Sequence, residues 1–179
     1  IGFYQKKIKQ IESSIEGLKL ARIRDDLKKY GIPKLQAGEE LIEHSAMMLV
    51  YLETHEQAKW VAHIITPDIL KGKEGRSNDF RPDPKIKTGS TNEQDYFLKT
   101  PDSKAKGGFT YKGFGFDRGH LAPSADFSWS QKALSESYFY SNMSPQRPEF
   151  NRDSWAKLED MMRAYLVRNL QTELIIITG

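Results

Sequence analysis

The sequence contains no cysteine, which excludes disulfide bonds and thiolate metal sites. It has no apolar run near the roughly 20 residues that a membrane-spanning helix needs, so we expect no stable membrane insertion. Neither sign of charge dominates: a formal net charge of +3 permits a polyanionic partner without requiring one. Glycine-rich phosphate loops, Gly-x-Ser-x-Gly elbows and acidic clusters of the two-metal type are also missing, which argues against three common classes of hydrolase.

The 179 residues suffice for one domain with a substantial core, and no repeat, low-complexity tract or clear linker divides them. The chain starts at Ile1 rather than at methionine, which we interpret as a processed N-terminus. An exported protein, periplasmic or secreted, with an N-terminal segment removed is the favoured localisation. The chain ends directly after the apolar run 174–177, so we expect the C-terminal part of the domain to be missing.

Residues 1–30 have the pattern of a long helix that Gly31 and Pro33 end. This helix would carry two apolar stripes of different phase. The first is formed by Ile8, Ile11, Ile15 and Leu18, and the second by Leu20, Ile23, Leu27 and Tyr30. We favour an amphipathic helix packed on the domain with a solvated charged face; the alternative is an arm that dimerises or contacts nucleic acid. We therefore divide the chain into a helical N-terminal arm, residues 1–45, and a second domain, residues 46–179.

The next segments read as a β-hairpin followed by a long polar connection. Residues 48–54 and 59–66 are rich in strand-forming residues around a turn at 55–57. Three histidines, His44, His55 and His63, show no metal-ligand spacing and are interpreted as surface or strand residues. Residues 68–108 are polar and interrupted by glycine and proline; the arginines at 76–84 either clamp phosphate or are simply solvated.

The four residues Asp117-Arg118-Gly119-His120 combine an acid, a guanidinium and an imidazole. If residues 116–120 form a strand, Arg118 and His120 share one face and Asp117 lies on the other. We expect a second strand at 138–144 and a helix from 151 to about 169, where Asn151 is either the N-cap or a functional residue. The run 173–178 is typical of a buried strand.

Three blocks occur in order along the chain: Asp117–His120, then Ser141-Asn142-Met143-Ser144-Pro145-Gln146, then Asn151 with Trp155 and Leu158-Glu159. Together they resemble the DNA/RNA non-specific endonucleases, a family of ββα-metal nucleases. This resemblance implies an α+β fold in which a ββα-metal (His-Me finger) core lies on an antiparallel sheet, here with an N-terminal helical arm.

The resemblance also implies a role for each matching residue. His120 corresponds to the general base, and Asn151 to the direct protein ligand of a divalent metal, usually Mg²⁺, with Mn²⁺ as a substitute. Glu159 corresponds to an acid that holds water on the metal, Asn142 to a residue that fixes the site, and Arg118 to a phosphate contact. Supporting substrate contacts correspond to Arg163 and, across a gap in the match, Arg76, while Asp117 orients its neighbours.

The implied function is a sugar-non-specific endonuclease that uses one metal and leaves 5′-phosphate ends. Its partners would be DNA and RNA, held through their phosphate backbones, which carry no sequence information. Two alternatives remain: a catalytically silent nucleic-acid-binding module on the same scaffold, and a structural or dimerising protein led by the N-terminal helix. A homodimer is possible under any of these.

Overall fold

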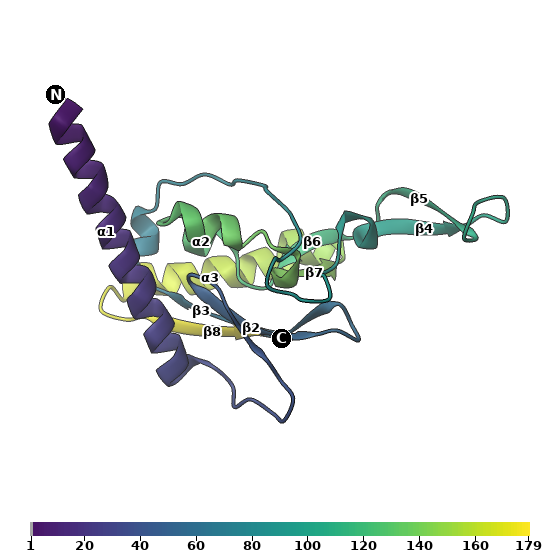
Figure 1. Ribbon diagram of the computed structural model, residues 1–179, viewed down its shortest axis with the longest axis horizontal. Coiled ribbons are helices and arrows are strands. Elements are labelled where there is room, and N and C mark those ends of the chain that lie inside the picture. Colours follow the sequence, from purple (N-terminus) through teal and green to yellow (C-terminus); the bar gives the residue numbers. More distant parts are fainter. Residues whose placement is uncertain (1) are drawn as a thin grey trace.

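A four-stranded antiparallel sheet forms the centre of the protein, whose structure, a computed structural model, describes residues 2–179. The strand order is β1-β2-β3-β8, with bounds Leu41–Glu43, Met47–Leu52, Gln57–Ile65 and Leu174–Thr178 (Figure 1). Two further antiparallel pairs, β4–β5 and β6–β7, complete the strands. The α+β class with antiparallel sheets is confirmed.

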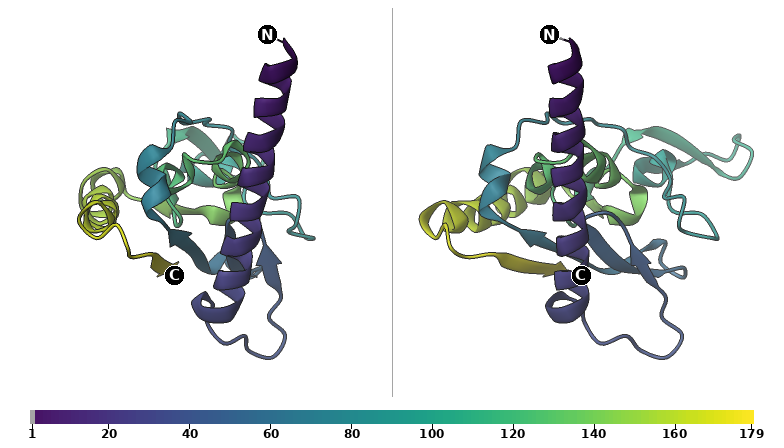
Figure 2. Two further views of the ribbon diagram at one scale, coloured as in Figure 1. Left: turned by 90° about the vertical axis from the view of Figure 1, so that its left-hand side faces the viewer. Right: turned by 60° about the vertical axis from the view of Figure 1, so that its left-hand side comes forward.

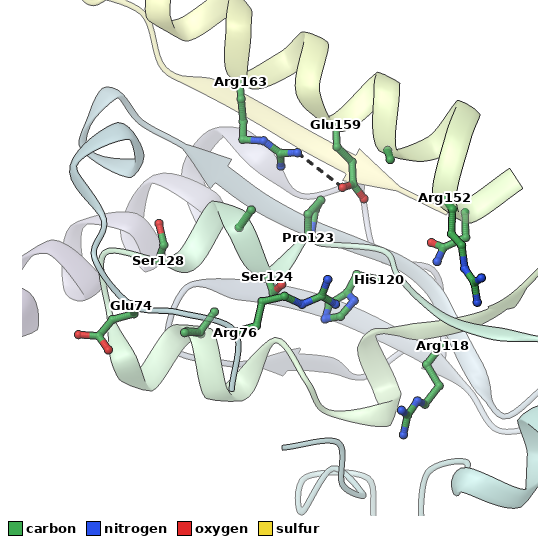
Figure 3. Close-up of a pocket in the computed structure, with 14 residues that line it drawn as sticks. Glu74, Arg76, Arg118, His120, Pro123, Ser124, Ser128, Arg152, Glu159 and Arg163 are labelled. Carbon is green, nitrogen blue, oxygen red and sulfur yellow. Dashed lines mark ion pairs between the residues drawn. The ribbon is translucent and has the colours of Figure 1, made fainter. Parts of the chain in front are cut away.

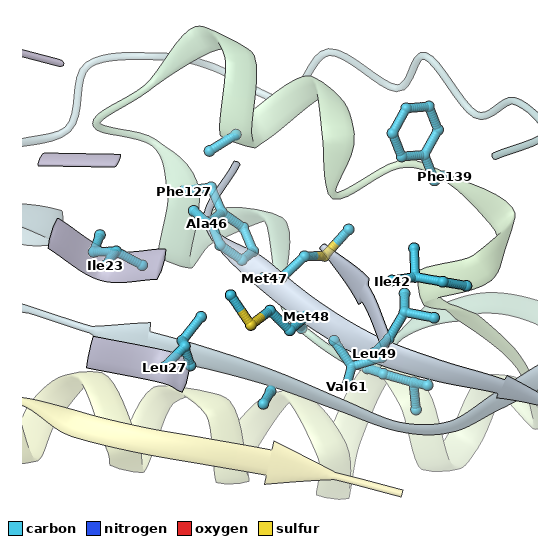
Figure 4. Close-up of a cluster of buried hydrophobic side chains, with 14 of the residues drawn as sticks. Ile23, Leu27, Ile42, Ala46, Met47, Met48, Leu49, Val61, Phe127 and Phe139 are labelled. Atoms are coloured by element: carbon cyan, nitrogen blue, oxygen red, sulfur yellow. The ribbon is translucent and has the colours of Figure 1, made fainter. Parts of the chain in front are cut away.

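Both faces of strand β2 are covered, as its unbroken apolar sequence requires. Met47, Met48, Leu49 and Val50 are all buried, and the predicted hairpin with β3 is present, joined by a turn at 53–56. The main hydrophobic cluster surrounds β2, with the end of the long N-terminal helix on one side and Phe127 on the other (Figure 4). Burial of these side chains anchors the elements that carry the site.

The long N-terminal helix is confirmed, but only half of it packs on the body. Helix α1 spans Gly2–Asp26 and continues as a π-helical turn, Leu27–Gly31. Leu20, Ile23 and Leu27 of its second apolar stripe are buried, although Tyr30 is exposed. The first stripe is 49–72% exposed, and the N-terminal half of α1 extends past the rest of the protein (Figures 1 and 2). The expected packing on the domain therefore holds for the C-terminal part of the helix, where Glu16 also accepts from Ser130 and Lys19 pairs with Asp68, but not for the N-terminal part. Within residues 2–179 no helix is both long and apolar enough to cross a membrane.

Two of the three histidines in this region are buried beside buried aspartates. His63, on β3, lies 3.0 Å from Asp126 through its Nε2 atom, and His44 lies 2.8 Å from Asp83 in the same way. His55, in the hairpin turn, is exposed. The surface-or-strand interpretation is wrong for His44, which is buried outside any strand because Asp83 from the long connection pairs with it.

The long connection contains regular structure that its composition did not reveal. Strands β4 (Phe97–Pro101) and β5 (Phe109–Phe114) form a hairpin that projects from the body (Figure 1). The preceding loop is held against the body at Arg81, whose guanidinium donates to Asp79 and to Ser135.

Strands β6 (Asp117–His120) and β7 (Met143–Gln146) precede a π-helical turn, Phe150–Trp155, and helix α3, Ala156–Arg168. The strand predicted at 138–144 is misplaced: residues 140–142 form a 3₁₀ turn, and Pro145 lies within β7, opposite Arg118. Proline is tolerated there because β7 pairs with β6 alone. On the unpaired side of β7 no backbone N–H is needed for a hydrogen bond.

Strand β8 pairs with β3 on one side only, and its side chains alternate between two environments. Leu174 and Ile176 pack in the cluster of Ile65 and Leu166, whereas Ile175 and Ile177 are exposed. The expectation of a strand buried on both faces is wrong, although the strand itself is present.

Candidate active site

A cavity of about 350 Å³ lies where β6, the loop around Arg76 and the start of α3 meet (Figure 3). Six of the residues selected from the sequence line it: Arg76, Arg118, His120, Asn151, Glu159 and Arg163. Two do not, Asn142 and Asp117. Among the lining residues that the sequence did not single out, Arg152 carries a charge into the same cavity.

His120 is the most perturbed group in the cavity. It is 8% exposed and packs against the rings of Phe80 and Tyr138, and the Trp155 indole N–H donates to its carbonyl oxygen at 3.1 Å. Burial, together with the positive charges of Arg76 and Arg118, lowers the pKa of His120 to about 3. Its Nε2 atom is buried without a hydrogen-bond partner anywhere in residues 2–179. The imidazole is therefore neutral at physiological pH and can accept a proton.

Asn142 fixes the chain that follows His120 rather than entering the cavity. Its Oδ1 atom accepts the Ala122 N–H at 2.9 Å, and its Nδ2 atom donates to the carbonyl oxygens of Ala122 and Ser137 at 2.9 and 2.8 Å. The side chain is fully buried, and all of these partners are backbone groups. These contacts are consistent with the expected role of Asn142 as a residue that fixes the site.

Asp117 connects strand β6 to the start of the helix. Its carboxylate accepts two hydrogen bonds from Arg152, at 2.8 and 2.7 Å, and one from Asn151 Nδ2 at 3.0 Å. The bonds from Arg152 in particular hold the pKa of Asp117 below its ordinary value, so the group is ionised and can only accept. The Asn151 amide nitrogen must therefore face Asp117, which leaves the amide oxygen available to another partner.

Asn151 does not cap the helix. It is the second residue of the π-helical turn, its backbone N–H donates to the Arg147 carbonyl at 2.9 Å, and its side chain turns to Asp117 instead of to the helix N-terminus. The N-cap interpretation is wrong, and Asn151 is one of the residues that line the cavity.

Glu159 and Arg163 occupy the α3 side of the cavity. Burial raises the pKa of Glu159 to about 7, although Arg163, at 3.7 Å, opposes this shift. Arg163 also pairs with Asp126 at 2.9 Å and with Asp160 at 2.8 Å. With three carboxylates around it, Arg163 is better placed to orient Glu159 than to bind a phosphate (Figure 3).

Arg118 and Arg76 supply positive charge on either side of His120. The Arg118 guanidinium stacks 3.7 Å above the Phe80 ring and pairs with Glu93 at 3.2 Å, while Arg76 donates to the Tyr138 hydroxyl at 3.3 Å. Figure 3 shows the Arg76 guanidinium beside the His120 ring and Arg118 at the edge of the cavity. The predicted common face of Arg118 and His120 is present, since both side chains line the cavity.

The side chains fit a hard divalent cation that keeps most of its water. Within residues 2–179 no group of three or more acidic, histidine or cysteine side chains could enclose a metal ion. Magnesium does not need such a cage, because it prefers oxygen ligands and dehydrates reluctantly. The amide oxygen of Asn151, whose direction Asp117 sets, and the carboxylate of Glu159 face one cavity and are suitable oxygen donors.

The chain is similar to known nucleases. The family described as DNA/RNA non-specific endonuclease matches residues 25–179. Mitochondrial endonuclease G of Homo sapiens is 35% identical over 147 residues, which are 82% of this chain and 43% of that protein. A nuclease of Nostoc sp. is 32% identical over 146 residues, 82% of this chain and 47% of that protein.

A solved structure of an EndoG/EndoGI complex is similar in fold, with a TM-score of 0.63 at 27% identity over 87% of this chain and 57% of that chain. The chain thus spans about half the length of the curated relatives it matches. The family match covers most of the chain, including every residue of the cavity. The protein belongs to the DNA/RNA non-specific endonuclease family.

Proposed function

We propose that this chain carries the catalytic centre of a metal-dependent endonuclease that hydrolyses phosphodiester bonds of both DNA and RNA. The observation that carries the proposal is a neutral imidazole, His120, in a cavity with four arginines and an amide whose nitrogen Asp117 holds, so that its oxygen is free for another partner. Base, phosphate-binding charge and metal ligand thus share one cavity.

In the proposed reaction, His120 takes a proton from the attacking water. The new P–O bond forms as the bond from phosphorus to the 3′ oxygen breaks. The 3′ oxygen takes a proton from a solvent water, and His120 then releases its proton to the resulting hydroxide, so that one water is consumed in total. The products are a 3′-hydroxyl and a 5′-phosphate. Arg118 and Arg76 complement the charge on the non-bridging oxygens.

Asn151 and Glu159 would hold Mg²⁺, or Mn²⁺ in its place. When bound, the ion supplies further charge neutralisation at the phosphate and assists departure of the 3′ oxygen. A nearby cation also favours the ionised form of Glu159, whose pKa of about 7 leaves it partly protonated at neutral pH. We therefore expect the metal to bind more tightly as the pH rises through 7.

Substrate binding should make His120 a stronger base. Arg76 and Arg118 are two of the three causes of its low pKa. A phosphate bound between these arginines offsets their charge, so the pKa of His120 moves back toward its ordinary value when substrate is present. Proton uptake is then coupled to the presence of a phosphodiester.

The β4–β5 hairpin extends the positive, aromatic surface beyond the cavity. Its four lysines, Lys99, Lys104, Lys106 and Lys112, are all exposed. The Phe114 ring lies 4.8 Å from the Phe97 ring and 4.8 Å from the Arg118 guanidinium, so the hairpin aromatics adjoin the phosphate-binding arginine. Lysines and aromatic rings bind backbone and bases without regard to sequence, which fits a non-specific substrate.

Cleavage of plasmid DNA and of a structured RNA, with Mg²⁺ and with EDTA, tests the proposal. We expect cleavage only with the metal, a loss of roughly 10²–10⁴-fold in rate for His120→Ala, and no loss for His55→Ala, a histidine exposed in the hairpin turn. Folded wild-type protein that binds nucleic acid but cleaves neither substrate would instead support the catalytically silent binding module.

A separate test addresses the metal ligands. Addition of Mg²⁺ should raise the melting temperature of the wild-type protein, because a ligand that binds only the folded state stabilises it. Asn151→Ala should remove this increase, since the amide oxygen is lost while the Asp117–Arg152 pair remains. An unchanged increase in the variant would exclude Asn151 as a ligand.

A further inference from the structure

The projecting β4–β5 hairpin carries its aromatic rings on one face (Figure 1). Lys99 pairs with Tyr111 and Pro101 with Phe109, and directly opposed residues of an antiparallel pair share a face. The Phe109 and Tyr111 rings therefore lie on one face, and they are exposed by 51 and 48%. The opposite face carries one large apolar side chain, Leu98, beside two threonines and a lysine.

A bulge brings a third ring to the same face. The register shifts between Phe97 and Lys99, so β5 has one residue more than β4 at this point. Gly113 lies in the longer stretch at a φ of +65°, a conformation that residues other than glycine rarely adopt. Strict alternation would place Phe114 on the face opposite to Tyr111, whereas the extra residue places both on one face. The Phe97 ring accordingly lies 4.8 Å from the Phe114 ring and 6.4 Å from the Tyr111 ring. We call Phe109, Tyr111 and Phe114 the ring row.

The ring row leads to the cavity. Arg118, which lines the cavity, lies with its guanidinium 4.8 Å from the centre of the Phe114 ring. The base of the hairpin is fixed to the body, because the Gly115 N–H donates to the Tyr96 carbonyl at 2.9 Å and the Tyr96 side chain is fully buried. The nucleotides next to a phosphate held by Arg118 are therefore within reach of the ring row.

The charge of the hairpin suits a polyanion. Residues 97–114 contain four lysines, all exposed, and one acid, Asp102. The Asp102 carboxylate accepts the Lys104 backbone N–H at 2.9 Å and so belongs to the turn. Exposed aromatic rings among lysines combine base stacking with attraction to the backbone, which are the two means by which proteins hold single strands.

We propose that the ring row stacks with unpaired bases beside the phosphate that is cut. This inference rests on the proposed nuclease function and adds a preferred substrate, nucleic acid that is single-stranded or locally unpaired next to the scissile bond. A ring stacks only on an exposed base face, and in a duplex the neighbouring base pairs cover these faces. Alternate residues of a strand are about 7 Å apart, roughly twice the spacing of stacked bases, so one base fits between successive rings.

Binding to strands with and without bases tests the stacking. The probe is a fluorescein-labelled oligothymidylate of roughly 12 nucleotides, a length within the range that single-strand surfaces hold. The comparison is an abasic strand of the same length and charge, with both strands in EDTA so that neither is cut. Wild type should bind the thymidylate roughly 5- to 150-fold more tightly. Phe109→Ala with Tyr111→Ala should remove most of this preference. Equal affinity of the wild type for the two strands would overturn the proposal.

The other face of the hairpin offers a matched control. Leu98 has the same 51% exposure as Phe109 but lies on the opposite face, so Leu98→Ala should leave both affinities unchanged. Tyr111→Trp should keep the preference for bases, because it keeps a ring. Lys99→Ala should weaken binding to both strands by the same factor. Circular dichroism and melting establish that the variants fold. A loss of preference in Leu98→Ala as large as in the double variant would refute the assignment to the ring row.

Cleavage separates failure of this proposal from failure of the proposed function. With Mg²⁺, the double variant should raise KM for a single-stranded oligonucleotide by the factor lost in affinity and leave kcat unchanged, because the stacking is equal in ground and transition states. Cleavage of the matched duplex should not change. An active enzyme without this change in KM would overturn only the stacking. A protein that prefers strands with bases in EDTA but cleaves nothing would overturn only the proposed function.

Two other occupants of the hairpin would give different results. A two-stranded ribbon also fits the major groove of a duplex, and in that case the double variant would lose as much affinity for the duplex as for the single strand. A membrane surface would appear as wild-type binding to anionic phospholipid vesicles that the double variant loses, without any preference for strands with bases. Either result would refute the proposal.

Discussion

The buried imidazole of His120 should make the protein sensitive to acid in a way that one substitution can isolate. The pKa of His120 falls from 6.5 to about 3 on folding, first because burial removes the charged form from water and then because of Arg76 and Arg118. Above pH 6.5 the ring is neutral in both states and the stability is complete. As the pH falls through 6.5 toward 3, His120 binds a proton in the unfolded chain but not in the folded protein, so the free energy of unfolding decreases.

The size of this effect follows from the two pKa values. At about pH 4.5, two units below the unfolded pKa, the proton uptake should lower the free energy of unfolding by about 2.7 kcal/mol. The full effect, over the whole interval of 3.5 units, is on the order of 5 kcal/mol. Because the His120 side chain is almost completely buried, little of this is lost to solvent screening.

Urea unfolding of wild-type protein and of His120→Gln, each at pH 7 and at pH 4.5, measures the effect. Glutamine cannot take up the proton, so wild type should lose about 2–3 kcal/mol more than the variant between the two pH values. All other titrating groups are common to both proteins, so the difference in slope isolates His120. Equal slopes would show that folding does not lower the pKa of His120, and the reasoning from its burial would be wrong.

Three further predictions concern the supports of the site. Asn142→Ala should lower the free energy of unfolding by about 2–4 kcal/mol in urea titrations, because it leaves buried backbone groups without partners. Asp117→Asn should raise the Mg²⁺ concentration for half-maximal cleavage roughly 10- to 100-fold, since the Asn151 amide loses its fixed direction. Lys99→Glu with Lys112→Glu should weaken binding of a labelled oligonucleotide and reduce the slope of log affinity against log salt by about 1–2; an unchanged slope would exclude the hairpin from the nucleic-acid interface.

The sequence predicted strand β6, which holds Arg118 and His120, but not the structure of residues 138–144. Alternation along Asp117–His120 correctly placed Arg118 and His120 at one cavity, because a strand fixes which side chains share a face. It failed at 138–144, where β-forming aromatics suggested a strand. Tyr138 and Tyr140 instead pack in the core around a 3₁₀ turn, so burial of their rings outweighed their local preference.

The residues that orient the site do so through contacts with residues far apart in the sequence, and no local sequence pattern predicts such contacts. Arg152 follows Asn151 directly, yet its partner Asp117 lies 35 residues away. Arg163 matched a substrate-binding residue, but its role depends on Asp126, which the folded chain brings from the loop after β6. The exposure of the first α1 stripe was equally invisible, because a 3.6-residue period marks an apolar face without saying what covers it.

The two faces of strand β6 serve different parts of the proposed site. His120 points into the cavity, where burial keeps it neutral, and Asp117 points to the other face. From that face, the Asp117 carboxylate accepts a hydrogen bond from the Asn151 side chain in the π-helical turn and so sets the direction of the amide. A π-helical turn, Phe150–Trp155, precedes the helix, and Asn151 lies inside this turn rather than at the N-cap position that the sequence suggested. In the proposed mechanism the strand supplies the base directly and orients the metal ligand through Asp117. His120→Ala should therefore lower the rate of cleavage, whereas Asp117→Asn should raise the Mg²⁺ concentration that cleavage needs.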